Sequence, residues 1–193
     1  MPIYNGIEFI DESVCSIINQ TFQDWELIIG INGHETNSQI YQIAKKYESK
    51  DTRINVYDLI DIKGKSNALN YMLKYTNYNW ISLLDVDDVW LPDKLQKQVN
   101  CFKDPEVGIV ISNVNYFNKK KKKKKFSTVP PSGYVFEDLL SEYYIVESSQ
   151  VLKRSYIDML SYHYDPEFNY IPDFDLVLRM SKICKLFVID EVL

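Results

Sequence analysis

The sequence predicts an α/β fold in which helices cover both faces of a mostly parallel central sheet, so that the chain forms a three-layer sandwich. Short apolar runs alternate with segments of helical periodicity along residues 1–100, which is the order of right-handed βαβ units. With 193 residues, 46% of them hydrophobic, the chain is long enough for a single domain with a substantial core. No internal repeat and no linker rich in Pro or Gly divides it.

The first half of the chain is expected to supply four strands and four helices. Its strands are expected at 1–5, 25–31, 53–57 and 80–84. Its helices carry apolar residues at helical spacing, as Ile10, Val14 and Ile17 do, and are expected at 8–20, 38–47, 68–73 and 92–102. Polar loops at 32–37 and 63–67 separate these elements.

The second half is expected to add three strands, at 107–117, 148–153 and 185–192, and helices at 134–144, at 155–160 and from 170 onward. Pro172 suits the first position of that last helix, because its fixed φ is compatible with a helix start. Asp175 and Arg179 are four residues apart and are expected to form an ion pair on its outer face.

The charge of the chain is distributed unevenly. Its net charge is −5, and the run from Lys119 to Lys125 supplies seven positive charges, so the remainder carries −12. An acidic body argues against a nucleic-acid-binding surface spread over the fold. Because like charges in a block repel one another, the lysine run is expected to be a solvated, irregular loop. The alternative is a basic segment that binds an anionic lipid or a phosphate-rich partner.

The stretch from Trp80 to Trp90 carries the strongest chemical signal. A short apolar run, expected to be a strand buried on both faces, is followed by Asp85, Asp87 and Asp88. In open α/β sheets, ligands bind beside the carboxyl ends of the strands. Carboxylates this close favour a hard divalent cation such as Mg²⁺, which combines one or two of them with phosphate oxygens. A solvated acidic turn before a helix is the other interpretation.

Other metal-binding and membrane signals are weak. His34 and His163 are too scattered for a histidine-based metal site, and the three cysteines form no C-x-x-C pair, which favours reduced thiols in a cytoplasmic compartment. No apolar run approaches the ~20 residues of a membrane helix, and no signal-peptide pattern precedes the first strand. We therefore expect a cytoplasmic protein with at most peripheral membrane contact.

An ordered set of motifs resembles the family 2 glycosyltransferases, enzymes of the GT-A (Rossmann-like) fold that use nucleotide-sugars. The similar segments, in family order, are 2–5, 16–22, 25–29, the Gly-Lys…Ala-Leu-Asn segment 64–70, the Asp-x-Asp segment 84–90 and the segment 173–179, which is similar to the family's late Glu-Asp-Tyr-Asp-Leu…Arg motif. Together they cover nearly the whole chain. The resemblance implies one GT-A domain, with a nucleotide-sugar-binding half at 1–100 and an acceptor half at 101–193.

The resemblance also implies a donor site for a nucleoside-diphosphate sugar, most often a UDP-sugar. It places Pro2 and Tyr4 near the base and Asn32 at the base or ribose. Lys65 would lie close to the diphosphate. The acidic residues would hold the ribose-diphosphate and Mn²⁺ or Mg²⁺, with Asp85 and Asp87 on the nucleotide-sugar side and Asp87 and Asp88 on the metal.

By the same resemblance, Asp173 matches the catalytic base, which deprotonates an acceptor hydroxyl for attack with inversion at the anomeric carbon. An apolar wall of Tyr170 and Phe174 is expected to tune its pKa. From spacing alone, Asp173 is also compatible with a carboxylate that stabilises a helix start. The resemblance leaves the acceptor open between a glycan, a lipid-linked sugar and a protein.

The chain departs from the family pattern in ways that define an alternative function. The family usually has paired acids where this chain has Ile31 and Asn32, and Glu where it has Pro172. We expect the chain to begin at the end of the family's first strand and to stop before the acceptor-side segment. The alternative is a truncated, non-catalytic protein with weak or no nucleotide-sugar binding. A nucleotidyltransferase of similar fold is disfavoured, because residues 2–6 offer no basic Gly-rich loop.

Overall fold

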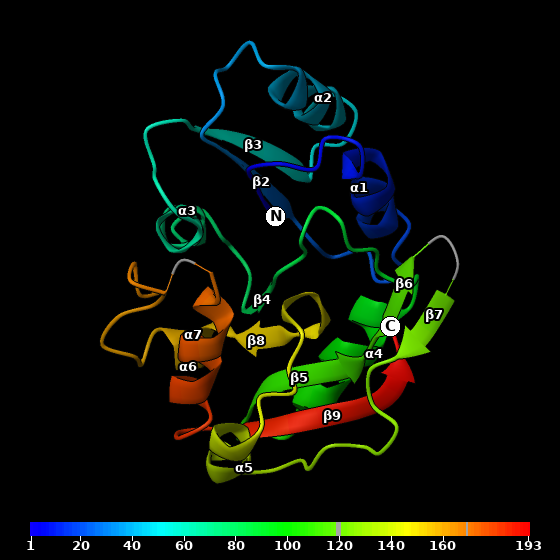
Figure 1. Cartoon of the computed structure of the whole chain (residues 1–193), viewed down its shortest axis with the longest axis vertical. Helices are drawn as coiled ribbons and strands as arrows, with labels where there is room; N and C mark the ends of the chain where they lie inside the picture. Colours follow the sequence, from blue (N-terminus) through cyan, green and yellow to red (C-terminus); the bar gives the residue numbers. More distant parts are fainter. Residues whose placement is uncertain (119–120, 169) are drawn as a thin grey trace.

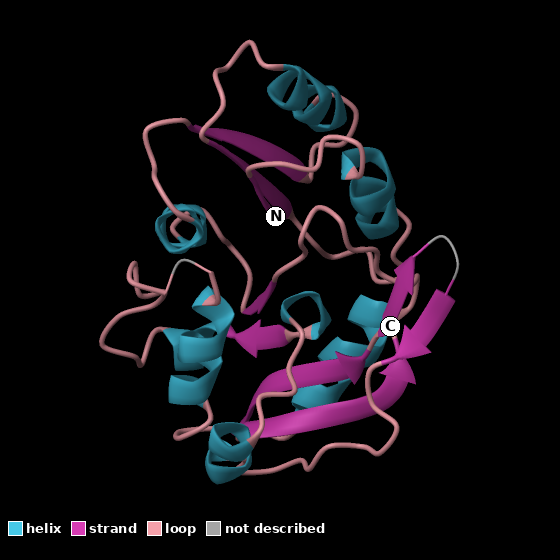
Figure 2. Cartoon of the chain, viewed as in Figure 1, coloured by secondary structure: helices cyan, strands magenta, loops and turns pink. Residues whose placement is uncertain are grey.

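The computed structural model describes residues 1–118, 121–168 and 170–193. Within them the strands form a three-stranded sheet in the order β1-β2-β3, a four-stranded sheet in the order β4-β8-β5-β9 and a two-stranded hairpin of β6 and β7 (Figures 1 and 2). The predicted alternation of strands and helices in the first half is confirmed from β1 to α4.

The first sheet is parallel throughout. It consists of β1 (Pro2–Ile3), β2 (Leu27–Asn32) and β3 (Ile54–Leu59). Every residue of β2 is buried, as its unbroken apolar run predicts. The helices α1 (Ile10–Ile18), α2 (Gln39–Glu48) and α3 (Lys65–Leu73) belong to this half, and α2 packs on β3 while α3 packs on β1 and β2.

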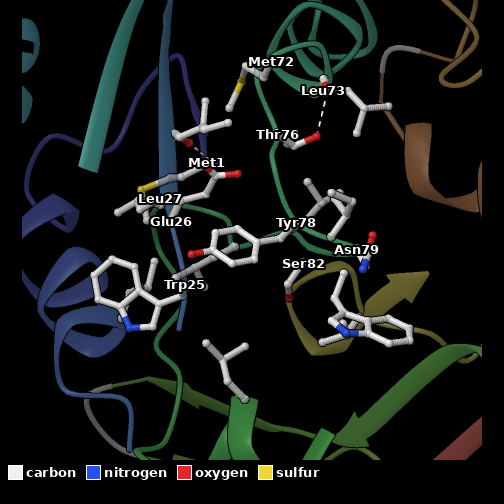
Figure 3. Close-up of a pocket in the computed structure, with 18 of the residues that line it drawn as sticks. Met1, Trp25, Glu26, Leu27, Met72, Leu73, Thr76, Tyr78, Asn79 and Ser82 are labelled. Atoms are coloured by element: carbon white, nitrogen blue, oxygen red, sulfur yellow. Dashed lines mark hydrogen bonds between the residues drawn. The ribbon is translucent and has the colours of Figure 1, made fainter. Parts of the chain in front are cut away.

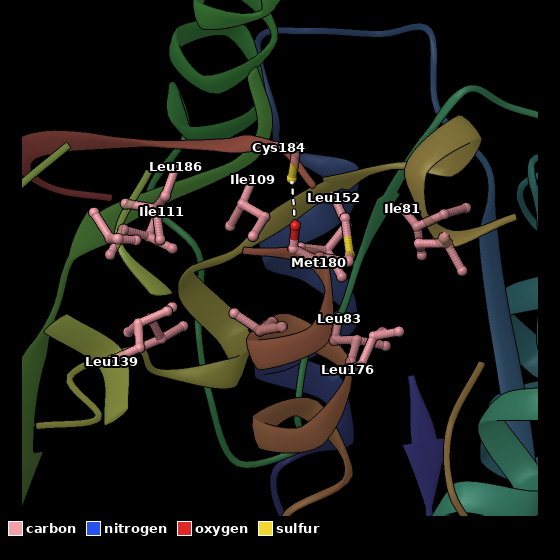
Figure 4. Packing of buried hydrophobic residues seen from close by; sticks show 14 of the residues in the cluster. Ile81, Leu83, Ile109, Ile111, Leu139, Leu152, Leu176, Met180, Cys184 and Leu186 are labelled. Atoms are coloured by element: carbon pink, nitrogen blue, oxygen red, sulfur yellow. Dashed lines mark hydrogen bonds between the residues drawn. The ribbon is translucent and has the colours of Figure 1, made fainter. Parts of the chain in front are cut away.

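The second sheet is mixed. The strand β8 (Val151–Lys153) lies antiparallel to both β4 (Trp80–Ser82) and β5 (Val107–Asn113), whereas β9 (Lys185–Val192) lies parallel to β5. The helices α4 (Lys94–Val99) and α7 (Pro172–Met180) both contact β5. Figure 4 shows Leu176 and Met180 of α7 packed over Ile109 and Leu152 of this sheet, at the centre of its hydrophobic core.

The α/β class is confirmed, but the sheet is divided. The strand β1 has only two residues and β4 only three, and among the described residues no hydrogen bonds join them. Because β4 has a strand on one side only, its Trp80 and Ser82 are half-buried, and the prediction of a strand buried on both faces is wrong here.

A cavity of about 460 Å³ lies between the two sheets, and we call it the inter-sheet cavity (Figure 3). Met1, Leu27 and Ile28 line it from the first sheet, and Trp80 and Ile81 line it from the second. The ammonium group of Met1 is buried at its edge and donates a hydrogen bond to the Ile28 carbonyl oxygen at 2.8 Å. The position that a continuous sheet would fill is therefore open.

The remaining elements are short. They are the helices α5 (Phe136–Ser141) and α6 (Arg154–Ile157) and the 3-10 turns η1 (Asn100–Lys103) and η2 (Glu147–Ser149). No helix in the described part of the chain is long and apolar enough to cross a bilayer. The predicted ion pair on α7 is confirmed, with Arg179 Nη2 2.6 Å from Asp175 Oδ2.

The lysine run differs from its prediction. Lys119 and Lys120 lie outside the described residues, but β7 (Lys121–Lys124) forms an antiparallel ladder with β6 (Asn115–Asn118). The prediction of an irregular loop is therefore wrong for these four lysines. A backbone ladder does not depend on the identity of the side chains, so a block of like charges does not by itself exclude a strand.

Candidate functional site

The candidate site begins where the parallel strands β1, β2 and β3 end, since their carboxyl ends share one edge of the sheet. Asn32 is the last residue of β2, and its buried amide donates to the Gly64 carbonyl oxygen at 3.5 Å. Gly64 precedes α3 with a φ of +85°, a conformation that favours glycine. The turn at Gly64 therefore places the start of α3, and with it Lys65, beside the end of β2.

Lys65 is held between two carboxylates. Its Nζ lies 2.8 Å from Asp85 Oδ1 and 2.6 Å from Glu147 Oε2. We call these three residues the Lys65 ion-pair cluster. Burial alone would lower the pKa of Lys65, but the charges of Glu147 and Asp85 outweigh burial and raise it. The structure thus brings together Lys65 and Asp85, two of the residues predicted for the donor site.

Glu147 is a site residue that sequence reasoning missed. Its side chain is 12% exposed, and its Oε1 is buried with no hydrogen-bond partner. Burial, followed by the charge of Asp85, raises the pKa of Glu147, while Lys65 acts in the opposite direction. No spacing in the sequence marks this residue, because its partner Lys65 is 82 positions away and only the fold joins them.

The acidic loop, residues 85–88, is tied to the turn η2. Ser148 Oγ accepts a hydrogen bond from the Asp85 backbone N–H at 3.1 Å. Burial raises the pKa of Asp88, a hydrogen bond with Ser148 opposes this, and the charges of Asp85 and Asp87 add to it. Asp87 is exposed.

The acidic loop does not enclose a metal position by itself. Within the described residues no three His, Cys, Asp or Glu side chains form a group that could hold an ion. The donor set is nevertheless compatible with Mg²⁺ or Mn²⁺, because hard cations favour oxygen ligands and Mg²⁺ is commonly held by one or two carboxylates together with substrate phosphates. Asp87 and Asp88 offer such carboxylates within two adjacent positions.

Asp173 lies near the start of α7 and is 7% exposed. Its Oδ2 accepts a hydrogen bond from the Tyr143 hydroxyl at 3.0 Å. Burial raises the pKa of Asp173, and the Tyr143 hydroxyl and the charge of Lys65 oppose this. The Ser66 hydroxyl donates to the Phe168 carbonyl oxygen at 3.1 Å, which ties the segment before α7 to the first turn of α3 beside Lys65.

The apolar wall beside Asp173 differs from expectation. Tyr170 is 98% exposed, so the prediction that it forms this wall is wrong. The ring of Phe174 instead packs edge-on against Tyr143, with ring centroids 4.8 Å apart. Tyr170 lies before the first residue of α7, where no packing partner fixes its position.

The residues expected to bind the base lie on β1, just after it and at the end of β2. Pro2 pairs with Gly30 inside the first sheet. Tyr4 is exposed and lines a cleft of about 430 Å³ together with residues 5–8, His34 and residues 38–40. His34 Nε2 contacts the Tyr4 carbonyl oxygen. Neither Pro2 nor Asn32 lines this cleft, so the structure does not gather all three around one cavity.

Two of the sequence relatives are Escherichia coli proteins named as glycosyltransferases. The chain is 29% identical over 162 residues to the Escherichia coli UDP-Glc:alpha-D-GlcNAc-diphosphoundecaprenol beta-1,3-glucosyltransferase WfgD, covering 84% of this chain and 62% of WfgD. It is 30% identical over 184 residues to the O-antigen biosynthesis glycosyltransferase WbnJ of the same species, covering 95% of this chain and 71% of WbnJ.

Solved structures share the fold. Staphylococcus aureus TarS 1–349 in complex with UDP superposes with a TM-score of 0.78 at 17% identity, covering 99% of this chain and 57% of that one. The mannosyltransferase PcManGT of Pyrobaculum calidifontis, solved with GDP-Man and Mn²⁺, gives a TM-score of 0.75 at 16% identity, covering 99% and 53%. These likenesses confirm the predicted GT-A fold. The chain spans less than two thirds of WfgD and of the TarS chain.

The family follows from the match along the sequence. The family model described as Glycosyl transferase family 2 matches residues 1–160. This segment contains β1 through α6, and with them the Lys65 ion-pair cluster and the acidic loop. The chain therefore belongs to the family 2 glycosyltransferases.

Proposed function

We propose that the chain is a metal-dependent, inverting glycosyltransferase that moves a sugar from a nucleoside-diphosphate sugar to an acceptor hydroxyl. The observation that carries the proposal is the Lys65 ion-pair cluster, in which a half-buried ammonium group lies 2.8 Å from Asp85 and 2.6 Å from Glu147. A fixed positive charge can stabilise a leaving diphosphate, and a buried carboxylate nearby can accept a proton. A UDP-sugar is our first choice of donor, since TarS was solved with UDP and UDP-GlcNAc and the name of WfgD specifies UDP-Glc.

In this proposal, residues 1–100 form the nucleotide-sugar-binding half and residues 101–193 the acceptor half. The nucleoside contacts Pro2, Tyr4 and Asn32. Lys65, Asp85 and Asp87 face the ribose-diphosphate. Asp87 and Asp88 hold Mn²⁺ or Mg²⁺, which, when bound, neutralises charge on the departing diphosphate. The complex of PcManGT with Mn²⁺ supports the choice of metal.

Asp173 is the proposed base. It removes the proton from an acceptor hydroxyl, whose oxygen forms a bond to the anomeric carbon while the bond from that carbon to the diphosphate oxygen breaks. The configuration inverts, and the nucleoside diphosphate leaves with the electron pair. The Tyr143 hydroxyl donates to Oδ2 of Asp173 and thereby orients the carboxyl group. Burial favours the protonated form and raises the pKa of this carboxyl towards the range of a working base.

The acceptor is proposed to be a lipid-linked sugar diphosphate, reached by peripheral contact with the cytoplasmic face of a membrane. The support is the printed name of WfgD, which specifies a GlcNAc-diphosphoundecaprenol acceptor. If an acceptor screen detects no transfer to a lipid-linked sugar, the acceptor is instead a soluble glycan or a protein.

Thermal melting with ligands tests the donor site. UDP, UDP-glucose, UDP-GlcNAc and GDP-mannose are each added with and without Mn²⁺. A ligand at about 100 times its Kd stabilises the folded state by about 2.7 kcal/mol, which raises Tm by roughly 5–10 °C for a chain of this size. A shift that requires both a nucleotide and Mn²⁺ is expected. A clean transition that no nucleotide shifts would support the alternative, a non-catalytic protein with a defective donor site.

Two variants test the assigned residues. Asp88→Asn is expected to lose the part of the shift that depends on Mn²⁺, and an unchanged shift would remove Asp88 from the metal site. Asp173→Asn is expected to keep the shift and to lose hydrolysis of the sugar donor by water. If hydrolysis persists at the wild-type rate, Asp173 is not the base.

A further inference from the structure

The geometry of Lys65 leaves one of its hydrogen-bond donors for a ligand. A lysine ammonium group has three N–H donors. One donates to Asp85 Oδ1, with Nζ 2.8 Å from this oxygen, and one donates to Glu147 Oε2, with Nζ 2.6 Å from that oxygen. The two carboxylates come from different parts of the chain, one from the end of β4 and the other from the turn before β8. Together they limit both the position of the nitrogen and the direction of its third N–H.

The turn that carries Glu147 is firmly attached to its surroundings. The Ser149 N–H donates to the Val146 carbonyl oxygen at 2.9 Å and closes the turn. The indole N–H of buried Trp90 donates to the Ser148 carbonyl oxygen at 2.8 Å. The Ser148 hydroxyl accepts from the Asp85 backbone. Glu147 is thus fixed relative to the acidic loop, which is what a residue that positions another side chain requires.

The second oxygen of Glu147 indicates a place for a ligand. Its Oε1 is buried without a hydrogen-bond partner in the described chain. Buried acceptors are nearly always paired in folded proteins, and an unpaired one is costly. A buried polar atom without a partner is expected where a polar ligand completes the site.

We propose that Glu147 is a positioning residue for the sugar donor, which holds the Lys65 ammonium group where its third N–H meets a diphosphate oxygen. This inference rests on the proposed function of the site. Without Glu147, Lys65 keeps only Asp85 as an anionic partner, and its ammonium group moves toward the acidic loop. There it neutralises a carboxylate that the donor and the metal would otherwise use.

The test compares Glu147→Gln with Glu106→Gln. The exposed Glu106 also accepts from a lysine at 2.6 Å, the half-buried Lys185, so it controls for the loss of one ion pair away from the site. Two readouts are measured on folded protein: the rate at which an N-hydroxysuccinimide ester acetylates Lys65, followed by peptide mass spectrometry, and the Kd of UDP with Mn²⁺ from calorimetry.

In Glu147→Gln, Lys65 is expected to be acetylated faster than in the wild type, because removal of the carboxylate lowers the pKa of the amine. Each pKa unit changes the neutral fraction of the amine about tenfold. Glu147→Gln is also expected to bind UDP about tenfold more weakly, since hydrogen bonds to charged groups are among the stronger ones. Glu106→Gln is expected to match the wild type in both. If Glu147→Gln fails to fold, Glu147→Asp, which shortens the side chain by one methylene, carries the same test.

Three outcomes separate the possibilities. Faster acetylation together with weaker UDP binding supports the proposal. Faster acetylation with unchanged UDP binding overturns it, since Glu147 would then hold Lys65 without serving the donor. A wild-type protein that binds none of the nucleotides overturns the proposed function and this inference together, whatever acetylation shows about the ion pair.

Discussion

The ammonium group of Met1 is expected to make the stability of the chain depend on pH. Burial lowers its pKa from 8.0 to about 5, with smaller opposing contributions from nearby charges. In the unfolded chain the pKa stays near 8, so the unfolded state binds the proton at a higher pH than the folded state. Stability is therefore greatest above pH 8 and is lost as the pH falls through the window from about 8 to about 5.

The size of this effect follows from the two pKa values. Three units at about 1.36 kcal/mol each give a total loss of about 4 kcal/mol at low pH. The same linkage gives a loss of about 1.4 kcal/mol at pH 7 and about 3 kcal/mol at pH 5.5. These are large amounts for a domain whose whole stability is typically about 5–15 kcal/mol.

The assay compares free and acetylated amino termini. A fusion protein cleaved so that Met1 becomes the first residue supplies the free amine, and intact mass verifies it. The acetylated chain is the control, because its amide keeps an N–H for the Ile28 carbonyl oxygen but cannot be protonated. The inter-sheet cavity beside Met1, about 460 Å³ in volume, has room for the acetyl group (Figure 3). Urea unfolding near pH 8.5, 7 and 5.5 gives the free energy of unfolding of each form.

The acetylated form is expected to gain stability over the free form as the pH falls, by about 3 kcal/mol at pH 5.5. All other titrating groups are common to both forms and cancel in the difference. A difference that stays constant from pH 8.5 to pH 5.5 would refute the reasoning, because it would mean that the amine reaches water in the folded state.

Two further predictions concern single side chains. Tyr143→Phe removes a hydrogen bond that lowers the pKa of Asp173. A hydrogen bond to a charged group contributes about 1.5–3 kcal/mol, so the acid limb of the pH profile of donor hydrolysis should move up by about one to two pH units. An unmoved limb would show that Asp173 is not the titrating base. Lys94 is fully buried and its pKa is well below the usual value, so its contribution to stability is lost as the pH falls below about 10.5. Lys94→Met should therefore gain stability over the wild type by up to about 1.4 kcal/mol per pH unit as the pH falls. Urea unfolding measures this gain, and parallel pH curves would contradict the expectation.

Much of the fold follows from local patterns. The apolar run of β2 and the helical spacing of α1 are short-range signals, and both elements form where they are expected. Short motifs likewise predict Lys65 and Asp173 as candidate site residues. In each case the signal lies within a few residues, so no tertiary contact is needed to recognise it.

What the sequence could not predict depends on contacts between distant residues. Glu147 gains its place in the site from Lys65, 82 positions away. The division of the sheet depends on whether β1 and β4 pair, and neither strand carries that information alone. The charge of the lysine run predicts an irregular loop, whereas the backbone of β7 pairs with β6. The sequence predicts Tyr170 in the apolar wall beside Asp173, whereas in the structure the ring of Phe174 packs against Tyr143.

The division of the sheet has a mechanical consequence. One hydrophobic core is built on the second sheet, and a separate one joins the first sheet to the acidic loop. Proteins open in cooperative units that follow such packing. The helix α3 connects the two cores, because it packs on β1 and β2 of the first sheet while its Leu69 and Leu73 belong to the core on the second sheet. Lys65 is the first residue of this connecting helix, so a diphosphate bound by Lys65 would stabilise the element through which the two cores are coupled.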